Sequence, residues 1–247
     1  MATTFTYFGG MCVLVEREDG FKTLFDPYIR ENPATDADIE QFFDVDLIVV
    51  THAAFDHNAD TAFLLQNSNA TLLCGGDVAR IVKKEMELPP ERVLVTIYGD
   101  ERIFGQSTLR TVYAMHNSVS RPEGVSVCSP PLGFVMQVEP GTTYYHTGDT
   151  FLYTDMKMLR ELYKPNVMVV GISKICEPYP CEMTPREAAC AVSWVGADVV
   201  IPSHYPVGSP ALGEFMTHVA SFAPSAIVRE AVGKPFVYHP FQVSWGK

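Results

Sequence analysis

Short apolar stretches alternate with turn residues along the first part of the chain. Gly9-Gly10 and the turn Glu18-Asp19-Gly20 separate three of these stretches, as in antiparallel strands joined by tight connections. Later stretches are uninterrupted apolar runs, which are typical of strands buried on both faces. The stretches predicted to form strands in this half are 3–7, 11–15, 21–25, 46–50, 70–74 and 93–95.

Helical patterns follow several of the strands, and capping residues mark where they begin. Asp77 and Thr154 are candidate N-caps, and Thr184-Pro185-Arg186-Glu187 combines a cap, Pro at the first helical position and Glu at the third. Gly196 ends that last helix. The predicted helices are 58–67, 78–88, 155–163, 184–195 and 212–222. The remaining predicted strands are 102–104, 107–115, 133–138, 142–146, 167–170 and 198–202.

The order of elements is β-rich, then alternating β and α, and this order occurs twice. An α/β (α+β) fold satisfies it, with two mixed sheets packed together and helices on both outer faces. No low-complexity linker divides the two halves. We therefore predict a single domain over residues 1–247.

Composition narrows the classes of function. The 247 residues are 47% hydrophobic and 19% charged, with a net charge of −11, so no overall basic field favours nucleic acid. No apolar run reaches the roughly 18 residues of a membrane span, and the N-terminus lacks the features of a signal peptide. The six cysteines form no Cys-x-x-Cys pair. We expect reduced thiols in a cytoplasmic protein, without a membrane or nucleic-acid partner.

Polar side chains follow four of the predicted strands immediately after their apolar runs. Rigid strand ends are where catalytic and binding groups are commonly held. Imidazole and carboxylate together suit zinc, iron or manganese. The candidate metal ligands are His52, Asp56, His57, His116, Asp149 and His204.

Taken singly, these residues have ordinary structural explanations. Asp56 could be the N-cap of the helix that follows it, and Asp149 could be a turn residue. His57, His116 and His204 could each be a buried structural histidine. Their occurrence together in one order along the chain favours a site.

That ordered set resembles the motifs of the metallo-β-lactamase-fold hydrolases. The matching stretches are Thr-His-x-x-x-Asp-His at 51–57, a later lone histidine, Thr-Gly-Asp-Thr at 147–150 and Pro-Ser-His-Tyr at 202–205. Asp26, in Leu-Phe-Asp-Pro, is similar to the family's early strand-end aspartate. Stretches 145–150, 183–188 and 201–205 look most like the ascorbate-phosphate-lactonase-like branch. The resemblance runs from about residue 5 to 207.

The resemblance implies an αββα sandwich with a dinuclear metal site at one edge of the two sheets. His52 and His116 would hold a first metal, whereas Asp56, His57 and His204 would hold a second, with Asp149 bridging them. Asp26 would orient the ligands without binding metal. His146, which precedes a turn, would either support the ligands or face the substrate.

Ala54 departs from the family pattern His-x-His-x-Asp-His, because it stands where the second histidine belongs. A methyl group cannot bind a metal, so the first position keeps only His52, His116 and the shared Asp149. We predict one firmly bound divalent ion (zinc, manganese or iron) and a second that is weak or absent.

Three alternatives to that prediction remain open. The loop 172–183 follows a buried strand and contains Cys176, Glu177, Cys181 and Glu182, one of which could replace the missing ligand. Ala54 could instead be an engineered inactivation. Finally, the protein could be a degenerate member that binds a metal or ligand without catalysis.

The predicted function is metal-dependent hydrolysis of a small ester, lactone or phosphoester. A bound metal would activate water, with Asp56 orienting it and accepting its proton and Asp149 holding the cluster together. Lys174 would attract an anionic group. A di-iron redox relative would carry Glu at position 54, and nucleic-acid-processing relatives have extra domains and basic surface. Relatives often assemble, which leaves a homo-oligomer open.

Overall fold

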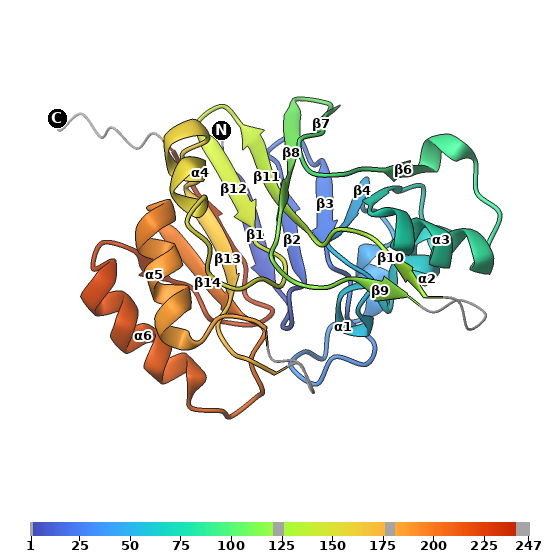
Figure 1. Ribbon diagram of the computed structural model, residues 1–247. Helices are drawn as coiled ribbons and strands as arrows, with labels where there is room; N and C mark the ends of the chain where they lie inside the picture. The colour runs from blue at the N-terminus through green and yellow to red at the C-terminus, as the bar shows by residue number, and fades with distance from the viewer. Residues whose placement is uncertain (1, 121–125, 176–180, 241–247) are drawn as a thin grey trace, which may run out of the picture.

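Two seven-stranded sheets face each other in the computed structural model, which describes residues 2–120, 126–175 and 181–240 (Figure 1). The first sheet has the order β16-β1-β2-β3-β4-β5-β6. Its strands from β16 to β3 pair antiparallel, whereas β3 to β6 pair parallel. Its bounds are β1 Thr3–Tyr7, β2 Val13–Glu16, β3 Lys22–Phe25, β4 Leu47–Val50, β5 Thr71–Cys74, β6 Val93–Val95 and β16 Phe236–Tyr238.

The second sheet has the order β15-β14-β13-β12-β11-β8-β7. Here β15 to β12 pair parallel, and β12, β11, β8 and β7 pair antiparallel. A separate pair of short strands, β9 Val119–Ser120 and β10 Val127–Cys128, lies outside both sheets. The bounds of the second sheet are β7 Glu101–Phe104, β8 Ser107–Tyr113, β11 Leu132–Glu139, β12 Thr142–His146, β13 Val167–Gly171, β14 Val199–Ser203 and β15 Ile227–Val228.

Helices cover the outer face of each sheet, so the layers are αββα (Figure 1). One apolar cluster joins the second sheet to its helices, and another joins the first sheet to its own. This confirms the predicted fold class. The α-helices are α1 Phe55–Asn58, α2 Thr61–Asn67, α3 Gly76–Glu85, α4 Met156–Leu162, α5 Pro185–Val195 and α6 Ala211–Phe222, and the 3-10 helices are η1 Ile39–Phe42 and η2 Pro90–Arg92.

The core between the two sheets is rich in aromatic rings. Phe25 lies edge-on to Tyr144, with 5.2 Å between ring centroids, and 6.4 Å from Phe134. All three side chains are fully buried. Burial of each such ring stabilises the fold by roughly 1.5–3 kcal/mol. These contacts hold the two sheets together below the edge where the polar strand ends meet.

Helix starts were predicted with mixed success. The helix predicted over 58–67 corresponds to α2, which begins later, at Thr61, because Ala59-Asp60 separate it from the short α1. There the Asp60 carboxylate accepts from the Ile29 backbone N–H at 2.6 Å instead of capping a helix. Asp77 is also not an N-cap, because α3 begins after Gly75 and Asp77 accepts from Ser118. Thr154 does not cap α4, where Asp155 occupies the cap position.

The start of α5 is confirmed in full. Thr184 accepts from the Glu187 backbone N–H, and the Glu187 side chain returns to the Thr184 N–H at 2.8 Å. Pro185 stands at the first helical position, and Gly196 closes the helix in the left-handed region at φ 72°. Such caps each contribute about 1 kcal/mol. Among the described residues, no helix has both the length and the apolar character to cross a membrane.

Candidate metal centre

The candidate ligands meet because their strands end at a shared edge. Strands β3 and β4 run parallel, and β12 and β14 run parallel to β13. Strand β8 points the same way as β12, since both pair antiparallel with β11. The residues that follow these strands therefore converge. They are Asp26 after β3, His52 after β4, His116 after β8, Asp149 after β12 and His204 after β14.

Asp149 lies at the centre of four imidazole rings. Its Oδ2 atom is 3.2 Å from His204 Nε2 and 3.3 Å from His57 Nε2. The same oxygen is 3.8 Å from His116 Nε2 and 3.9 Å from His52 Nε2. All four histidines thus present the same ring nitrogen to one carboxylate. This central place is the one that a bridging ligand requires.

Asp56 and His57 lie on α1, and both side chains lie close to His204, which follows β14. Asp56 Oδ2 is 3.2 Å from His204 Nε2 and 3.9 Å from His57 Nε2. Asp56 is not a helix cap, because Ala54 holds the cap position and makes no side-chain hydrogen bond there. The Asp56 carboxylate is therefore directed into the cluster, and a structural explanation as a cap is excluded.

Asp26 ties the cluster to the core through four contacts. Its Oδ1 accepts from the Thr51 N–H at 2.8 Å, and its Oδ2 lies 2.8 Å from Thr51 Oγ1 and from His57 Nδ1. His146 Nε2 completes the set at 3.0 Å, and the Tyr144 hydroxyl holds the other nitrogen of His146. With Nδ1–H of His57 donating to Asp26, His57 Nε2 is the nitrogen left to bind a metal. His146 is fully buried beside Asp26 and lies away from any surface a substrate could reach.

Backbone strain concentrates at the same edge. Among described residues other than glycine, three have positive φ, and two of them are Asp26 at 45° and His204 at 53°. This left-handed conformation is unfavourable for residues with a Cβ and persists where surrounding contacts enforce it. No other residue fits at Gly148, which has φ 59°, because a Cβ there would lie 2.6 Å from the Leu132 carbonyl oxygen. The turn that presents Asp149 therefore requires glycine.

Charges inside the cluster keep Asp149 ionised. Burial by itself raises the pKa of Asp149, but the neighbouring His204 and His57 outweigh burial and hold that pKa well below its usual range. Burial lowers the pKa of His57, yet Asp149 and Asp26 raise it well above its ordinary value. Burial and the nearby His57 lower the pKa of His52 to about 3. His52 is therefore neutral at pH 7, the form that binds metals.

The buried atoms of the cluster fit a divalent metal. Among the described residues, eleven buried polar side-chain atoms lack a hydrogen-bond partner, and seven of them belong to this cluster. Ligands about 2.0–2.2 Å from an ion lie roughly 3.0–3.6 Å from one another, close to the Asp149 distances. The seven atoms are His52 Nε2, His57 Nε2, both carboxylate oxygens of Asp149, both of Glu182, and His204 Nδ1, which is not the His204 nitrogen nearest Asp149. The individual ligand roles stay predictions.

The side chains around the first position include two that the motif does not contain. Cys181 Sγ lies 3.0 Å from His116 Nδ1. Glu182 is 1% exposed, and it groups within 4.8 Å with His116 and Cys181, and again with Asp149 and His204. The sequence indicated only that the loop 172–183 could contain a replacement ligand. Cys176 and Glu177, the other two candidates from that loop, lie outside the described residues.

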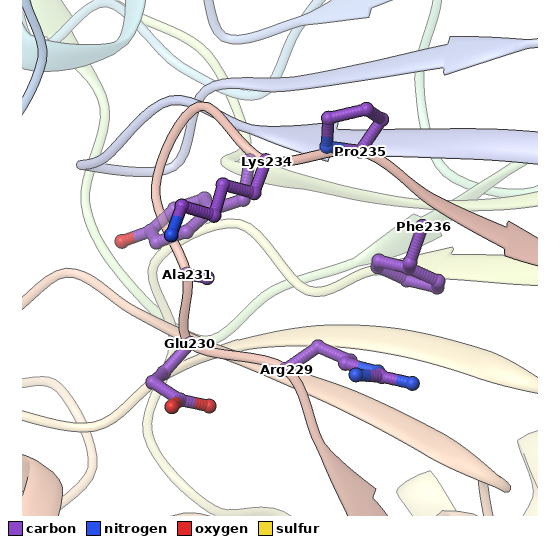
Figure 2. Close-up of a pocket in the computed structure, with 7 residues that line it drawn as sticks. Arg229, Glu230, Ala231, Lys234, Pro235 and Phe236 are labelled. Carbon is purple, nitrogen blue, oxygen red and sulfur yellow. The ribbon is translucent and has the colours of Figure 1, made fainter.

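A separate hollow lies beside β16, at the edge of the first sheet (Figure 2). It has a volume of about 290 Å³ and brings together Arg229, Glu230, Lys234 and the ring of Phe236. None of the candidate ligands lines it. The hollow offers mixed charge but no cluster of buried ionisable groups, so we do not assign the chemistry to it.

Two facing mixed sheets with a His/Asp cluster at their strand ends define a metallo-β-lactamase-fold protein. The Beta-lactamase superfamily domain matches residues 21–205 of the chain. A UPF0173 metal-dependent hydrolase of Rubrobacter xylanophilus is 30% identical over 207 residues, which cover 82% of this chain and 81% of the relative. Another from Carboxydothermus hydrogenoformans is 32% identical over 214 residues, covering 85% and 89%. The chain therefore belongs to the metal-dependent hydrolases of the β-lactamase superfamily.

Solved structures support the same fold. Igni18, a metallo hydrolase from the archaeon Ignicoccus hospitalis, superposes with a TM-score of 0.79 at 24% identity, covering 97% of this chain and 99% of that one. The predictions of the fold, of hydrolase activity and of family membership are thus confirmed. The lactonase-like branch and the identity and number of the metals stay predictions.

Proposed function

We propose that the protein hydrolyses a small, uncharged ester or lactone with metal-activated water at the cluster around Asp149. The observation that carries this substrate class is a set of exposed apolar side chains next to the candidate ligands. Apolar side chains exposed around a few convergent polar groups are typical of small-molecule sites. The set comprises Phe55 (56% exposed), Met115 (39%), Phe151 (42%) and Val207 (68%).

Each of these four residues lies within three positions of a candidate ligand. Phe55 precedes Asp56, and Phe151 follows Asp149 by two positions. The Phe151 N–H donates to the Met115 carbonyl oxygen at 3.2 Å, which joins two of the flanking segments. An apolar group of a substrate would contact these side chains while its carbonyl faces the cluster.

Among the described residues, few basic side chains near the site are free to bind a strongly anionic substrate. Two basic side chains close to the site in sequence have partners already. Lys174 Nζ lies 3.9 Å from Glu187, and Arg30 pairs with Asp60 at 2.5 Å. Little unpaired positive charge from these residues is left for a phosphate group, so we rank a phosphoester second.

A divalent metal, when bound, would lower the pKa of a water molecule and polarise the substrate carbonyl. His52, His116 and Asp149, and Asp56, His57, His204 and Asp149, are the residues that would hold it. Asp56 keeps its side chain 36% exposed, so one edge of its carboxylate can reach incoming water. Burial raises its pKa, but His57 and His204 outweigh burial and lower it to about 2.

Asp56 is therefore ionised at neutral pH and accepts a hydrogen bond from the attacking water, which orients it. A group with so low a pKa is a weak base, so orientation is its main contribution and it holds the proton only briefly. Asp149 is fully enclosed by imidazoles and takes no proton. Its role is to keep the surrounding histidines in their positions relative to one another.

The test is a substrate panel with zinc, manganese and iron supplied in turn. It compares aryl esters and neutral lactones with phosphodiesters and phosphorylated sugar lactones. We expect kcat/KM for the neutral substrates to exceed that for the charged ones at least tenfold, and Asp149→Ala to remove both activities. Higher activity on phosphorylated lactones would favour the lactonase-like branch instead. No turnover with any substrate and metal would support a non-catalytic binding protein.

A further inference from the structure

Glu182 is a buried carboxyl group without a partner among the described residues. Its side chain is 1% exposed, and neither carboxylate oxygen makes a hydrogen bond within the described part of the chain. Burying such a group without a partner is costly, and buried carboxylates are normally paired or bind metal. The motif that identifies the family does not include this position, so its burial needs a separate explanation.

The surroundings of Glu182 consist of the candidate ligands themselves. One of its oxygens, a nitrogen of His116 and the sulfur of Cys181 lie within 4.8 Å of one another. An oxygen of Glu182 also groups within 4.8 Å with Asp149 and His204. The carboxylate thus lies near His116, in the half that Ala54 leaves short of a donor, and also near His204 of the other half.

The backbone around Glu182 holds this position rigidly. Met183, the next residue, is fully buried in the apolar cluster beneath the second sheet. Thr184 then forms the capping box with Glu187 that fixes the start of α5. A side chain carried on a fixed helix entrance is held more precisely than one on a free loop.

Cys181 fits a different role. Its sulfur lies 3.0 Å from His116 Nδ1, and with Nδ1–H donating to it, His116 Nε2 keeps its lone pair towards Asp149. This contact orients His116, and among the described residues of the loop Glu182 is the buried side chain whose donor atoms have no hydrogen-bond partner.

We propose that Glu182 is a metal ligand that supplies the donor missing at Ala54 and completes the first position with His52, His116 and Asp149. The inference rests on the proposed function only in requiring a divalent metal. Exchanging an imidazole for a carboxylate moves the position towards metals that favour oxygen, such as manganese. The protein accordingly binds two Mn²⁺ ions, with one of them dependent on Glu182.

The test measures metal binding rather than turnover. Protein stripped of metal is titrated with Mn²⁺, and bound equivalents are determined by equilibrium dialysis with elemental analysis and by the electron paramagnetic resonance signal of free Mn²⁺. We expect two equivalents for the unaltered chain. Glu182→Gln keeps the shape of the side chain, and it should leave one equivalent unchanged and weaken the other roughly 100-fold, because even loss of an orienting partner costs about 10–100-fold.

A second variant tests whether Glu182 replaces the absent histidine. Adding Ala54→His to Glu182→Gln should restore the second equivalent to within tenfold of the original affinity, which a purely structural glutamate would not allow. Glu139→Gln is the matched control, since Glu139 is also buried but accepts hydrogen bonds from Thr3 and from the Glu18 N–H. It should leave both equivalents unchanged.

Two results would overturn the inference. One is two unchanged equivalents in folded Glu182→Gln; the other is a single equivalent in the unaltered chain that Glu182→Gln does not affect. Folding of each variant is checked by circular dichroism. If metal binding follows the proposal while the substrate panel shows no turnover, the proposed function fails and the assignment of Glu182 stands.

Discussion

The two halves of the metal centre are built in different ways. The half formed by Asp56, His57 and His204 has a candidate ligand at every position that the family resemblance implies, and Asp26 contacts His57 from within the core at 2.8 Å. The half formed by His52 and His116 lacks a histidine at position 54, and His116 is supported by the partly exposed Cys181.

The difference shows how a site can lose a motif residue without losing its donors. In the intact half, Asp56 and His57 are neighbours on α1 and His204 follows β14, and all three lie in stretches that match the motif. In the altered half, the proposed donor is the carboxylate of Glu182, which lies just before α5 and far along the chain from His52. We expect the intact half to bind metal more tightly, because its supporting network is fully buried and charged.

The largest effect should follow from removing the group that both halves share. Asp149→Ala leaves four imidazoles without the central carboxylate, so both metal equivalents and all hydrolysis should be lost. Elemental analysis of the purified variant measures the first, and the ester assay the second. His218→Ala on α6, whose ring stacks on Phe222, is the control that should retain both. Retained metal in Asp149→Ala would refute the central role of this residue.

Asp26→Asn should weaken the intact half more than the altered one. Loss of the orienting charge should lower the affinity of one metal equivalent about 10–100-fold. It should also reduce the free energy of unfolding by about 3–5 kcal/mol, because His57 and His146 lose their buried partner. Metal titration separates the two halves, and urea unfolding of the metal-free protein gives the stability.

The stability effect of Asp26→Asn should depend on pH. Burial raises the pKa of Asp26, but His57 and His146 outweigh it and hold the pKa well below its usual range. A lowered folded pKa means that the stabilisation is complete above the unfolded value of about 4 and is lost as pH falls below it. The difference in free energy of unfolding between the unaltered protein and Asp26→Asn should therefore become smaller below pH 4. If the difference in unfolding free energy did not change with pH, the charge of Asp26 would not be the cause of the stabilisation.

Much of this centre could be predicted from the sequence, for a physical reason. Buried strands read as apolar runs, and the polar residues directly after them mark the shared sheet edge, so His52, Asp149 and His204 were identifiable. The role of Glu182 was not, because it depends on where the chain returns after β13. The prediction of an N-cap at Asp77 is wrong for a similar reason. The Asp77 carboxylate accepts a hydrogen bond from Ser118, which lies 41 residues further along the chain.

A moderate effect should follow from trimming the apolar side chains beside the ligands. Phe151→Ala should raise KM for an aryl ester roughly fivefold, about 1 kcal/mol of lost contact, with kcat nearly unchanged. Ile103→Ala on β7, 72% exposed in the unaltered protein, is a control for loss of an exposed apolar side chain. An equal change in both variants, or a fall in kcat alone, would argue against substrate contact at Phe151.

The smallest effect concerns the cap that carries Glu182. Thr184→Ala removes the hydroxyl that accepts from the Glu187 N–H at 3.3 Å, and it should lower the free energy of unfolding by about 1 kcal/mol. Because Met183 stays buried and Pro185 still starts the helix, Glu182 should shift little. We expect the Glu182-dependent Mn²⁺ equivalent to weaken less than tenfold and the other equivalent to remain unchanged. Equal weakening of both would mean that the entrance of α5 supports the whole cluster and not the altered half alone.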